Sequence, residues 1–103
     1  LLARIRLHPE LPWRVEELAR EAGLSRAQFT RCVRARCGQA PRPFVQACRI
    51  ERARELLLGG GQDLAAIAQA CGYADRFHFG RHFAAATGCP PARFRRGGQP
   101  RGE

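Results

Sequence analysis

An internal repeat constrains the fold of this 103-residue chain more than any other feature of its sequence. Leu18-Ala19 and Gly23 recur 49 positions later as Ile67-Ala68 and Gly72. A second set recurs 50 positions later: Phe29, Arg31, Gly38, Pro41 and Phe44 return as Phe79, Arg81, Gly88, Pro91 and Phe94. The second copy therefore has one extra residue between Gly72 and Phe79. A turn tolerates such an insertion, whereas inside a helix it would rotate the apolar face by about 100°.

Each copy is expected to form two helices separated by a short turn that contains glycine. Apolar residues at i, i+3 and i+4 predict the first helix of each copy; they are Val15, Leu18 and Ala19, and then Leu64, Ile67 and Ala68. Gly23 and Gly72 end these helices. The second helices begin at a capping box of Ser25 with Gln28 and at the N-cap Asp75. Their expected buried residues are Phe29, Cys32 and Val33 in the first copy, and Phe79, Phe83 and Ala86 in the second.

A longer helix from Pro43 to Leu58 is expected to connect the two copies, since proline suits a first helical turn and glycines follow. Its length of about 24 Å, with the flanking modules added, is expected to place the two second helices about one DNA turn, roughly 34 Å, apart. The predicted fold is all-α with about seven helices. Residues 1–40 form a first helix-turn-helix subdomain, 41–60 a linker helix, 61–96 a second helix-turn-helix subdomain and 97–103 a disordered tail.

The charge predicts an anionic partner. All 18 basic residues are Arg, against nine acidic residues, which gives a net charge of +9. Codon usage in a GC-rich genome explains Arg in place of Lys, but not the twofold excess of positive charge. Nucleic acid is the first candidate partner and an acidic membrane surface the second. The chain contains no apolar run long enough to cross a bilayer, and its start lacks the features of a signal peptide.

The sequence predicts neither an enzyme nor a metal protein. The five cysteines contain no C-x-x-C pair, and the main interpretation is that they are buried small hydrophobic residues in a reducing compartment. A zinc site of Cys89 with His78 and His82 is a weaker alternative, because no second cysteine is suitably placed. The carboxylates lie at helix ends or on exposed faces, and no nucleophile has a plausible base. No catalytic residue, metal ligand or cofactor is therefore predicted.

The chain from about Leu7 to Arg96 resembles the DNA-binding domain of AraC/XylS-type bacterial transcription regulators. The strings that carry the resemblance are Trp13 with Val15-Glu16-Glu17-Leu18-Ala19, Gly23-Leu24-Ser25, Arg49-Ile50-Glu51-Arg52-Ala53-Arg54-Glu55-Leu56-Leu57, Ile67-Ala68 with Gly72-Tyr73, Phe79 with Arg81 and Phe83, and Gly88-Cys89-Pro90-Pro91 with Phe94-Arg95. The resemblance implies two helix-turn-helix units that bind promoter DNA. Three positions depart from the family pattern: Arg14 replaces a Ser or Thr cap, Phe77 a small polar residue, and Gly80 lies inside a helix.

The resemblance also implies which residues contact DNA. The base-reading positions are expected to be Ala27, Thr30 and Arg31 in the first unit, and Arg76, Phe77, Gly80 and Arg81 in the second. The expected phosphate contacts are Arg14, Arg26, Arg34, His78 and Arg95. Two alternatives stay open: Phe77 either touches a thymine methyl or packs inward, and His78 either contacts a phosphate or packs on the connecting helix. Trp13 is expected to be a packing residue.

The leading hypothesis is sequence-specific binding of double-stranded DNA for transcription regulation, with two recognition helices in successive major grooves. Alternatives are the DNA-binding part of a larger fusion, either a sensor regulator or a DNA-repair methyltransferase, and a basic protein-interaction module. The expected location is the bacterial cytoplasm, at the nucleoid. The domain is expected to be a monomer, with RNA polymerase as a further partner, while a full-length protein would dimerise through an N-terminal domain. The sequence leaves the operator, the effector and activation versus repression open.

Overall fold

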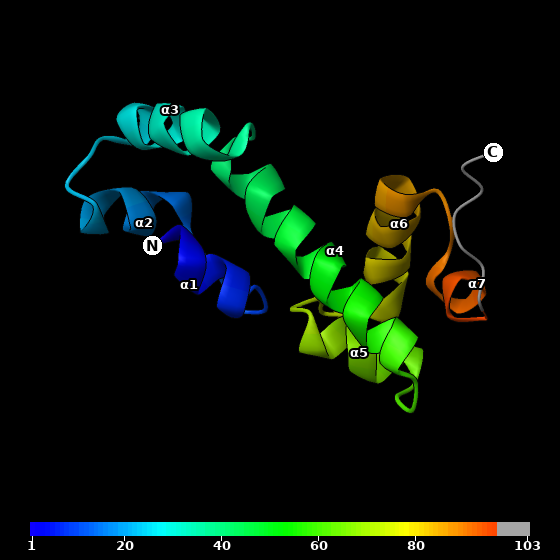
Figure 1. Ribbon diagram of the computed structural model, residues 1–103. Coiled ribbons are helices and arrows are strands. Elements are labelled where there is room, and N and C mark those ends of the chain that lie inside the picture. The colour runs from blue at the N-terminus through cyan, green and yellow to red at the C-terminus, as the bar shows by residue number, and fades with distance from the viewer. Residues whose placement is uncertain (97–103) are drawn as a thin grey trace. The chain divides into compact units, whose positions relative to one another are not determined.

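The computed structural model describes residues 1–96, which form seven helices and contain no strand. The helices are α1 (Leu2–Leu7), α2 (Val15–Glu21), α3 (Arg26–Cys37), α4 (Pro41–Gly59), α5 (Leu64–Ala70), α6 (Arg76–Thr87) and α7 (Pro91–Arg95) (Figure 1). The all-α prediction is confirmed. The predicted disordered tail, 97–103, lies outside the described residues. The chain divides into two compact units, Leu1–Cys48 and the residues from Arg49 onward, with the boundary inside α4.

The first unit is built around one apolar cluster. Its buried members come from α1, α2, α3 and the start of α4: Ile5, Val15, Leu18, Ala19, Phe29, Val33 and Phe44. Trp13 is half-buried against this cluster, and its indole Nε1 donates a hydrogen bond to the carbonyl oxygen of His8 at 2.8 Å. The interpretation of Trp13 as a packing residue is therefore confirmed.

The second unit has its own apolar cluster, which is rich in aromatic rings. Its buried members come from the rest of α4, α5, α6 and α7: Ile50, Ala53, Leu57, Ile67, Ala68, Cys71, Tyr73, Phe79, Phe83, Cys89 and Phe94. Phe83 lies between two other rings, with centroids 5.7 Å from Phe79 and 5.3 Å from Phe94. Such tilted and edge-to-face contacts are the favoured arrangement of aromatic pairs. This ring stack joins α6 to α7.

The turns between the paired helices begin with the same hydrogen bonds. In the first unit Leu24 N donates to the carbonyl of Ala19 at 2.9 Å, and Gly23 N donates to that of Arg20 at 3.0 Å. In the second unit Tyr73 N and Gly72 N donate to the carbonyls of Ala68 and Gln69 at the same two distances. This is the Schellman arrangement, which needs a left-handed residue, and Gly23 and Gly72 have φ values of 74° and 93°.

The structure places the extra residue of the second repeat at Ala74. The first turn covers residues 22–25, whereas the second covers 71–75. The two turns have the same hydrogen bonds up to Leu24 in the first unit and Tyr73 in the second. In the first unit the N-cap Ser25 follows at once, whereas in the second unit Ala74 comes before the N-cap Asp75. The predicted insertion in the turn is thus confirmed and located. The helices on either side keep equal lengths in the two units.

The predicted N-caps are present, with different chemistry in the two units. Ser25 and Gln28 form the reciprocal capping box, with hydrogen bonds of 3.1 and 2.9 Å. The Asp75 carboxylate accepts from the backbone N–H groups of Phe77 and His78, at 2.9 and 2.8 Å. These donors stabilise the charged form, so the pKa of Asp75 lies below its usual 3.8, with the bond from His78 as the largest cause.

The prediction that all the cysteines are buried is wrong, as is the burial of Ala86. Cys71 and Cys89 are buried, but Cys37 and Cys48 are half-buried and Cys32 is exposed. Cys32 lies at the edge of the narrow arc that α3 buries through Phe29 and Val33, and Ala86 lies near the C-terminal end of α6, beyond Phe79 and Phe83. Apolar character alone does not place an edge residue inside.

Two glycines are expected to respond oppositely to alanine. Gly88 ends α6 with φ of 79°, so Gly88→Ala forces a left-handed alanine and should lower the free energy of unfolding by about 1 kcal/mol. Gly80 lies inside α6 with nothing within 4 Å of an added Cβ, so Gly80→Ala should raise the free energy of unfolding by about 1 kcal/mol. Urea unfolding of both variants checks this. A destabilised Gly80→Ala would mean that α6 needs glycine there for packing.

The Asp75 cap predicts a pH dependence of stability. Because the folded-state pKa lies below the unfolded one, the cap contributes at neutral pH, and the contribution is lost as the pH falls below 3.8. The native chain should therefore lose thermal stability more steeply than Asp75→Asn between about pH 5 and pH 2, since asparagine caps a helix without titrating. Parallel acid slopes for the two proteins would contradict this origin of the acid sensitivity.

Candidate nucleic-acid interface

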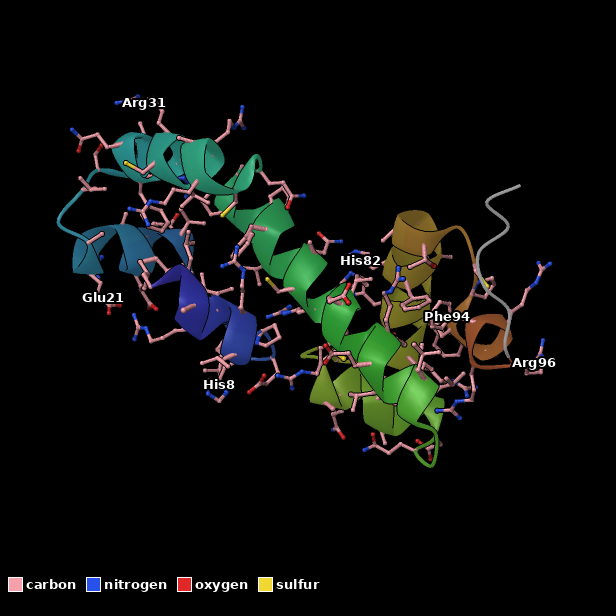
Figure 2. The ribbon with its side chains drawn as sticks, in the orientation of Figure 1. His8, Glu21, Arg31, His82, Phe94 and Arg96 are labelled. Carbon is pink, nitrogen blue, oxygen red and sulfur yellow. The ribbon has the colours of Figure 1, made fainter. Side chains whose placement is uncertain are left out.

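The solvent face of α3 carries the predicted contacts of the first unit. Ala27, Arg31 and Arg34 are exposed and lie at i, i+4 and i+7, so they share one stripe, with the half-buried Thr30 beside it. Phe29 and Val33, on the opposite side, are only 4% and 3% exposed. Figure 2 shows Arg31 projecting from α3 on the side away from α2. This stripe therefore offers one small apolar side chain and two guanidinium groups to a partner.

The solvent face of α6 repeats this arrangement 50 positions later. Phe77 and Arg81 are exposed where α3 has Ala27 and Arg31, and the half-buried Gly80 corresponds to Thr30. Phe77 is 66% exposed, which is unusual for so large an apolar side chain, so its alternative of packing inward is wrong. The guanidinium carbon of Arg76 lies 5.2 Å from the centroid of the Phe77 ring.

The five residues predicted to contact phosphate differ in how they are held. The guanidinium of Arg26 pairs with the Glu16 carboxylate, and Arg95 donates to the backbone oxygen of Gln62. Arg14 and Arg34 are exposed, and across residues 1–96 neither has an ion pair. The same holds for the base-reading candidates Arg31 and Arg81. These four guanidinium groups are thus available to a partner without breaking an internal ion pair.

A cationic hollow lies beside α2 in the first unit. Its volume is about 230 Å³, and its lining is Trp13, Arg14, Val15, Glu16, Arg26 and Arg42. Arg14 occupies the N-cap position of α2 and its side chain makes no capping hydrogen bond, as expected of an arginine in place of Ser or Thr. Three guanidinium groups around one carboxylate leave the hollow with net positive charge.

Sequence reasoning missed a contact network on α6. The Nε2 atoms of His78 and His82 lie 3.1 Å apart, and Nδ1 of His82 lies 3.3 Å from the Tyr73 hydroxyl. The ring of Tyr73 meets both imidazoles edge-on. His78 therefore contacts both His82 and Tyr73. The position of His82 on α6 is labelled in Figure 2. The only signal in the sequence was the i, i+4 spacing of the two histidines.

The surroundings of His82 favour its neutral form. Partial burial lowers the pKa of His82 below its usual 6.5, and the electrostatic effects of His78, Arg81 and Arg49 lower it further. Arg49, on α4, places its guanidinium 6.0 Å from the centroid of the Tyr73 ring. His82 therefore carries an uncharged imidazole at neutral pH.

The three-ligand zinc hypothesis does not hold. In the described part of the chain no group of three or more His, Cys, Asp or Glu side chains is arranged to hold a metal ion. Cys89 is buried, and its thiol lies against the carbonyl oxygen of Pro90 at 3.5 Å, so it does not join His78 and His82. Separately, no helix among residues 1–96 is long and apolar enough to cross a membrane.

Comparison with known proteins places this geometry in a family. A family model described as a helix-turn-helix domain matches residues 18–97. An uncharacterized HTH-type transcriptional regulator of Haemophilus influenzae is 33% identical over 95 residues, which cover 92% of this chain and 32% of the relative. A putative AraC-like transcription regulator of Streptomyces lividans is 33% identical over 88 residues, or 85% of this chain and 29% of the relative. The chain spans about a third of the length of these curated relatives.

Solved structures give the same result. The DNA-binding domain of AdpA, a global transcriptional factor determined in complex with a target DNA, is 29% identical with a TM-score of 0.85, covering 93% of this chain and 90% of that one. An AraC-type regulator of Chromobacterium violaceum is 25% identical with a TM-score of 0.84, covering 98% and 90%. From the paired helix-turn-helix units and these matches together, the chain belongs to the AraC/XylS-type helix-turn-helix DNA-binding domains of bacterial transcription regulators.

Proposed function

We propose that this chain binds double-stranded promoter DNA in a sequence-dependent manner, with α3 and α6 as recognition helices in major grooves. The observation that carries the proposal is the matched solvent face of the two helices, with Ala27 and Arg31 in the same register as Phe77 and Arg81. In helix-turn-helix proteins the second helix of each pair enters the major groove. The AdpA domain, solved with its target DNA, supports the same use of this fold.

The proposed base contacts follow from side-chain chemistry. Arg31 and Arg81 each present a planar fork that matches O6 and N7 of guanine, and Arg76 adds a third. Ala27 and the exposed ring of Phe77 are suited to a thymine methyl group. Thr30 and Gly80, half-buried beside these residues, are small enough to let each helix approach the base edges closely. Each unit thus combines an arginine that donates hydrogen bonds to guanine with an apolar side chain that contacts a thymine methyl group.

The proposed phosphate contacts fall into two groups. Arg14 and Arg34 can reach phosphate directly, because neither has an ion pair in the described chain. Arg26 must exchange the Glu16 carboxylate for a phosphate, and Arg95 must leave the Gln62 carbonyl. His78 likewise has to leave His82. We therefore propose Arg14 and Arg34 as the main phosphate contacts of the set.

We further propose that a single chain applies both units to one duplex, so that a monomer reads two half-sites. Each unit has its own apolar cluster and its own recognition helix, which supports this use. The division of the chain into 1–40, 41–60 and 61–96 belongs to the same proposal. RNA polymerase is proposed as the further partner, at the nucleoid in the bacterial cytoplasm.

Selection from a random pool of duplexes tests the proposal. The purified chain should enrich two short half-sites with a spacing of about one helical turn, roughly 10 base pairs. Footprinting and the mass of the complex should show one chain per pair of half-sites. A pool that stays random, with only salt-sensitive background binding, would instead favour a basic protein-interaction module.

Single substitutions test the assignment of contacts. Arg31→Ala should relax one half-site and Arg81→Ala the other, each at a cost of about 1–3 kcal/mol in discrimination, because a bidentate guanine contact is lost. Arg34→Ala should weaken binding to all sequences similarly and reduce the salt slope by about one. Arg20→Ala, on the exposed last turn of α2, is the matched control and should bind as the native chain does. Full discrimination by both Arg31→Ala and Arg81→Ala would show that the recognition faces are assigned wrongly.

A further inference from the structure

The histidine pair on α6 has the geometry of a metal chelate. Two bonds of about 2.0–2.1 Å from imidazole nitrogens to one ion, with the nitrogens 3.1 Å apart, subtend an angle of about 100° at the ion. That angle lies between the octahedral and tetrahedral values. The i, i+4 spacing holds both imidazoles on one face of a helix, so no backbone change is needed to bring them together. The separation of the two nitrogens therefore matches what one ion requires.

The Tyr73 hydroxyl suits both states of this pair. Without metal, Tyr73 can donate to Nδ1 of His82, whose Nε2–H then donates to His78. With metal, both Nε2 lone pairs point at the ion, and Nδ1–H of His82 donates to the Tyr73 oxygen instead. A hydroxyl both donates and accepts, so the Tyr73 hydroxyl and Nδ1 of His82 can stay hydrogen-bonded to each other in both states. A hydrogen-bond partner on the outer ring nitrogen is what orients a metal-binding histidine.

We propose that Nε2 of His78 and Nε2 of His82 form a bidentate site for a divalent transition-metal ion of the Ni²⁺, Cu²⁺ or Zn²⁺ class. Imidazole is the ligand type that these ions share. Within residues 1–96 no third His, Cys, Asp or Glu completes the site, so water fills the other coordination positions. Tyr73 is a positioning residue that fixes the ring of His82.

The charges around the pair oppose a metal ion. Arg49 on α4 and Arg81 on α6 place positive charge beside His82. The same two guanidinium groups repel a dication, so the site is an open chelate of modest affinity. Metal and proton compete for the same nitrogens, and binding therefore weakens as the pH falls.

The position of the site connects it to DNA recognition without depending on it. His78 lies next to Phe77 in sequence, and His82 lies next to Arg81, both on the proposed recognition helix. An ion bound there holds the first two turns of α6 together and adds positive charge to this face. Metal binding is measured in the absence of DNA, and DNA binding is measured with a chelator present. A failure of either proposal is therefore distinguishable from a failure of the other.

Titration calorimetry with NiCl₂ on the purified chain, at about pH 7.5 with a phosphine reductant, tests the site. One Ni²⁺ should bind per chain and raise the melting temperature, since the ion binds only the folded pair. His78→Gln and His82→Gln should each weaken binding by at least about tenfold, because the second intramolecular ligand is lost. Tyr73→Phe should weaken it by about tenfold while keeping the ring.

Two matched controls separate this site from other donors. His8→Gln removes the third histidine, which lies on the other unit, and Cys32→Ser removes the exposed thiol. Both should bind Ni²⁺ as the native chain does. Circular dichroism confirms that each variant keeps its helices. Native-like Ni²⁺ binding by His78→Gln or His82→Gln, or no binding by the native chain, would overturn the proposal and leave the pair as a hydrogen-bonded contact only.

Discussion

Both units depend on a left-handed glycine after the first helix of each pair. With φ positive at Gly23 and Gly72, the chain reverses within a few residues and the last carbonyls of the helix are satisfied by the turn itself. The next residue, Leu24 or Tyr73, then packs against the apolar cluster of its own unit. Any residue with a Cβ is strained at these two positions. The backbone conformation at these two glycines therefore helps to set the direction in which α3 and α6 leave the turn.

The helices and their ends could be predicted because their signals are local. Capping residues, glycines and apolar spacing each act within one or two turns, and Ser25 with Gln28 and Asp75 cap as predicted. Burial was harder to predict, because it depends on which neighbour reaches a residue. Cys32 and Ala86 are apolar residues beside buried aromatic rings, yet neither is covered. Ala74 illustrates the same limit: the repeat revealed an insertion between Gly72 and Phe79, but only the hydrogen bonds of the turn locate it.

The candidate nucleic-acid interface shows the same difference between features with local signals, which could be predicted, and features that depend on neighbouring helices, which could not. The repeat and the family pattern were enough to predict that Arg31 and Arg81 are exposed. The two residues lie 50 positions apart and occupy equivalent positions on the solvent faces of α3 and α6. The partners of long polar side chains could not be predicted in this way. Glu16, which pairs with Arg26, belongs to another helix, and Gln62, which accepts from Arg95, lies 33 positions away in the chain. Such contacts arise from tertiary packing, which no short window of sequence contains.

Helix α4 supplies residues to both apolar clusters: Phe44 belongs to the first, and Ile50, Ala53 and Leu57 to the second. A duplicated module normally keeps the freedom to be lost, shuffled or fused elsewhere on its own. A cut before α4 would take Phe44 from the first cluster, and a cut after α4 would take Ile50, Ala53 and Leu57 from the second. A cut between the two clusters divides the helix itself. The two copies differ in sequence and in turn length, yet each needs its own part of one shared helix to complete its core.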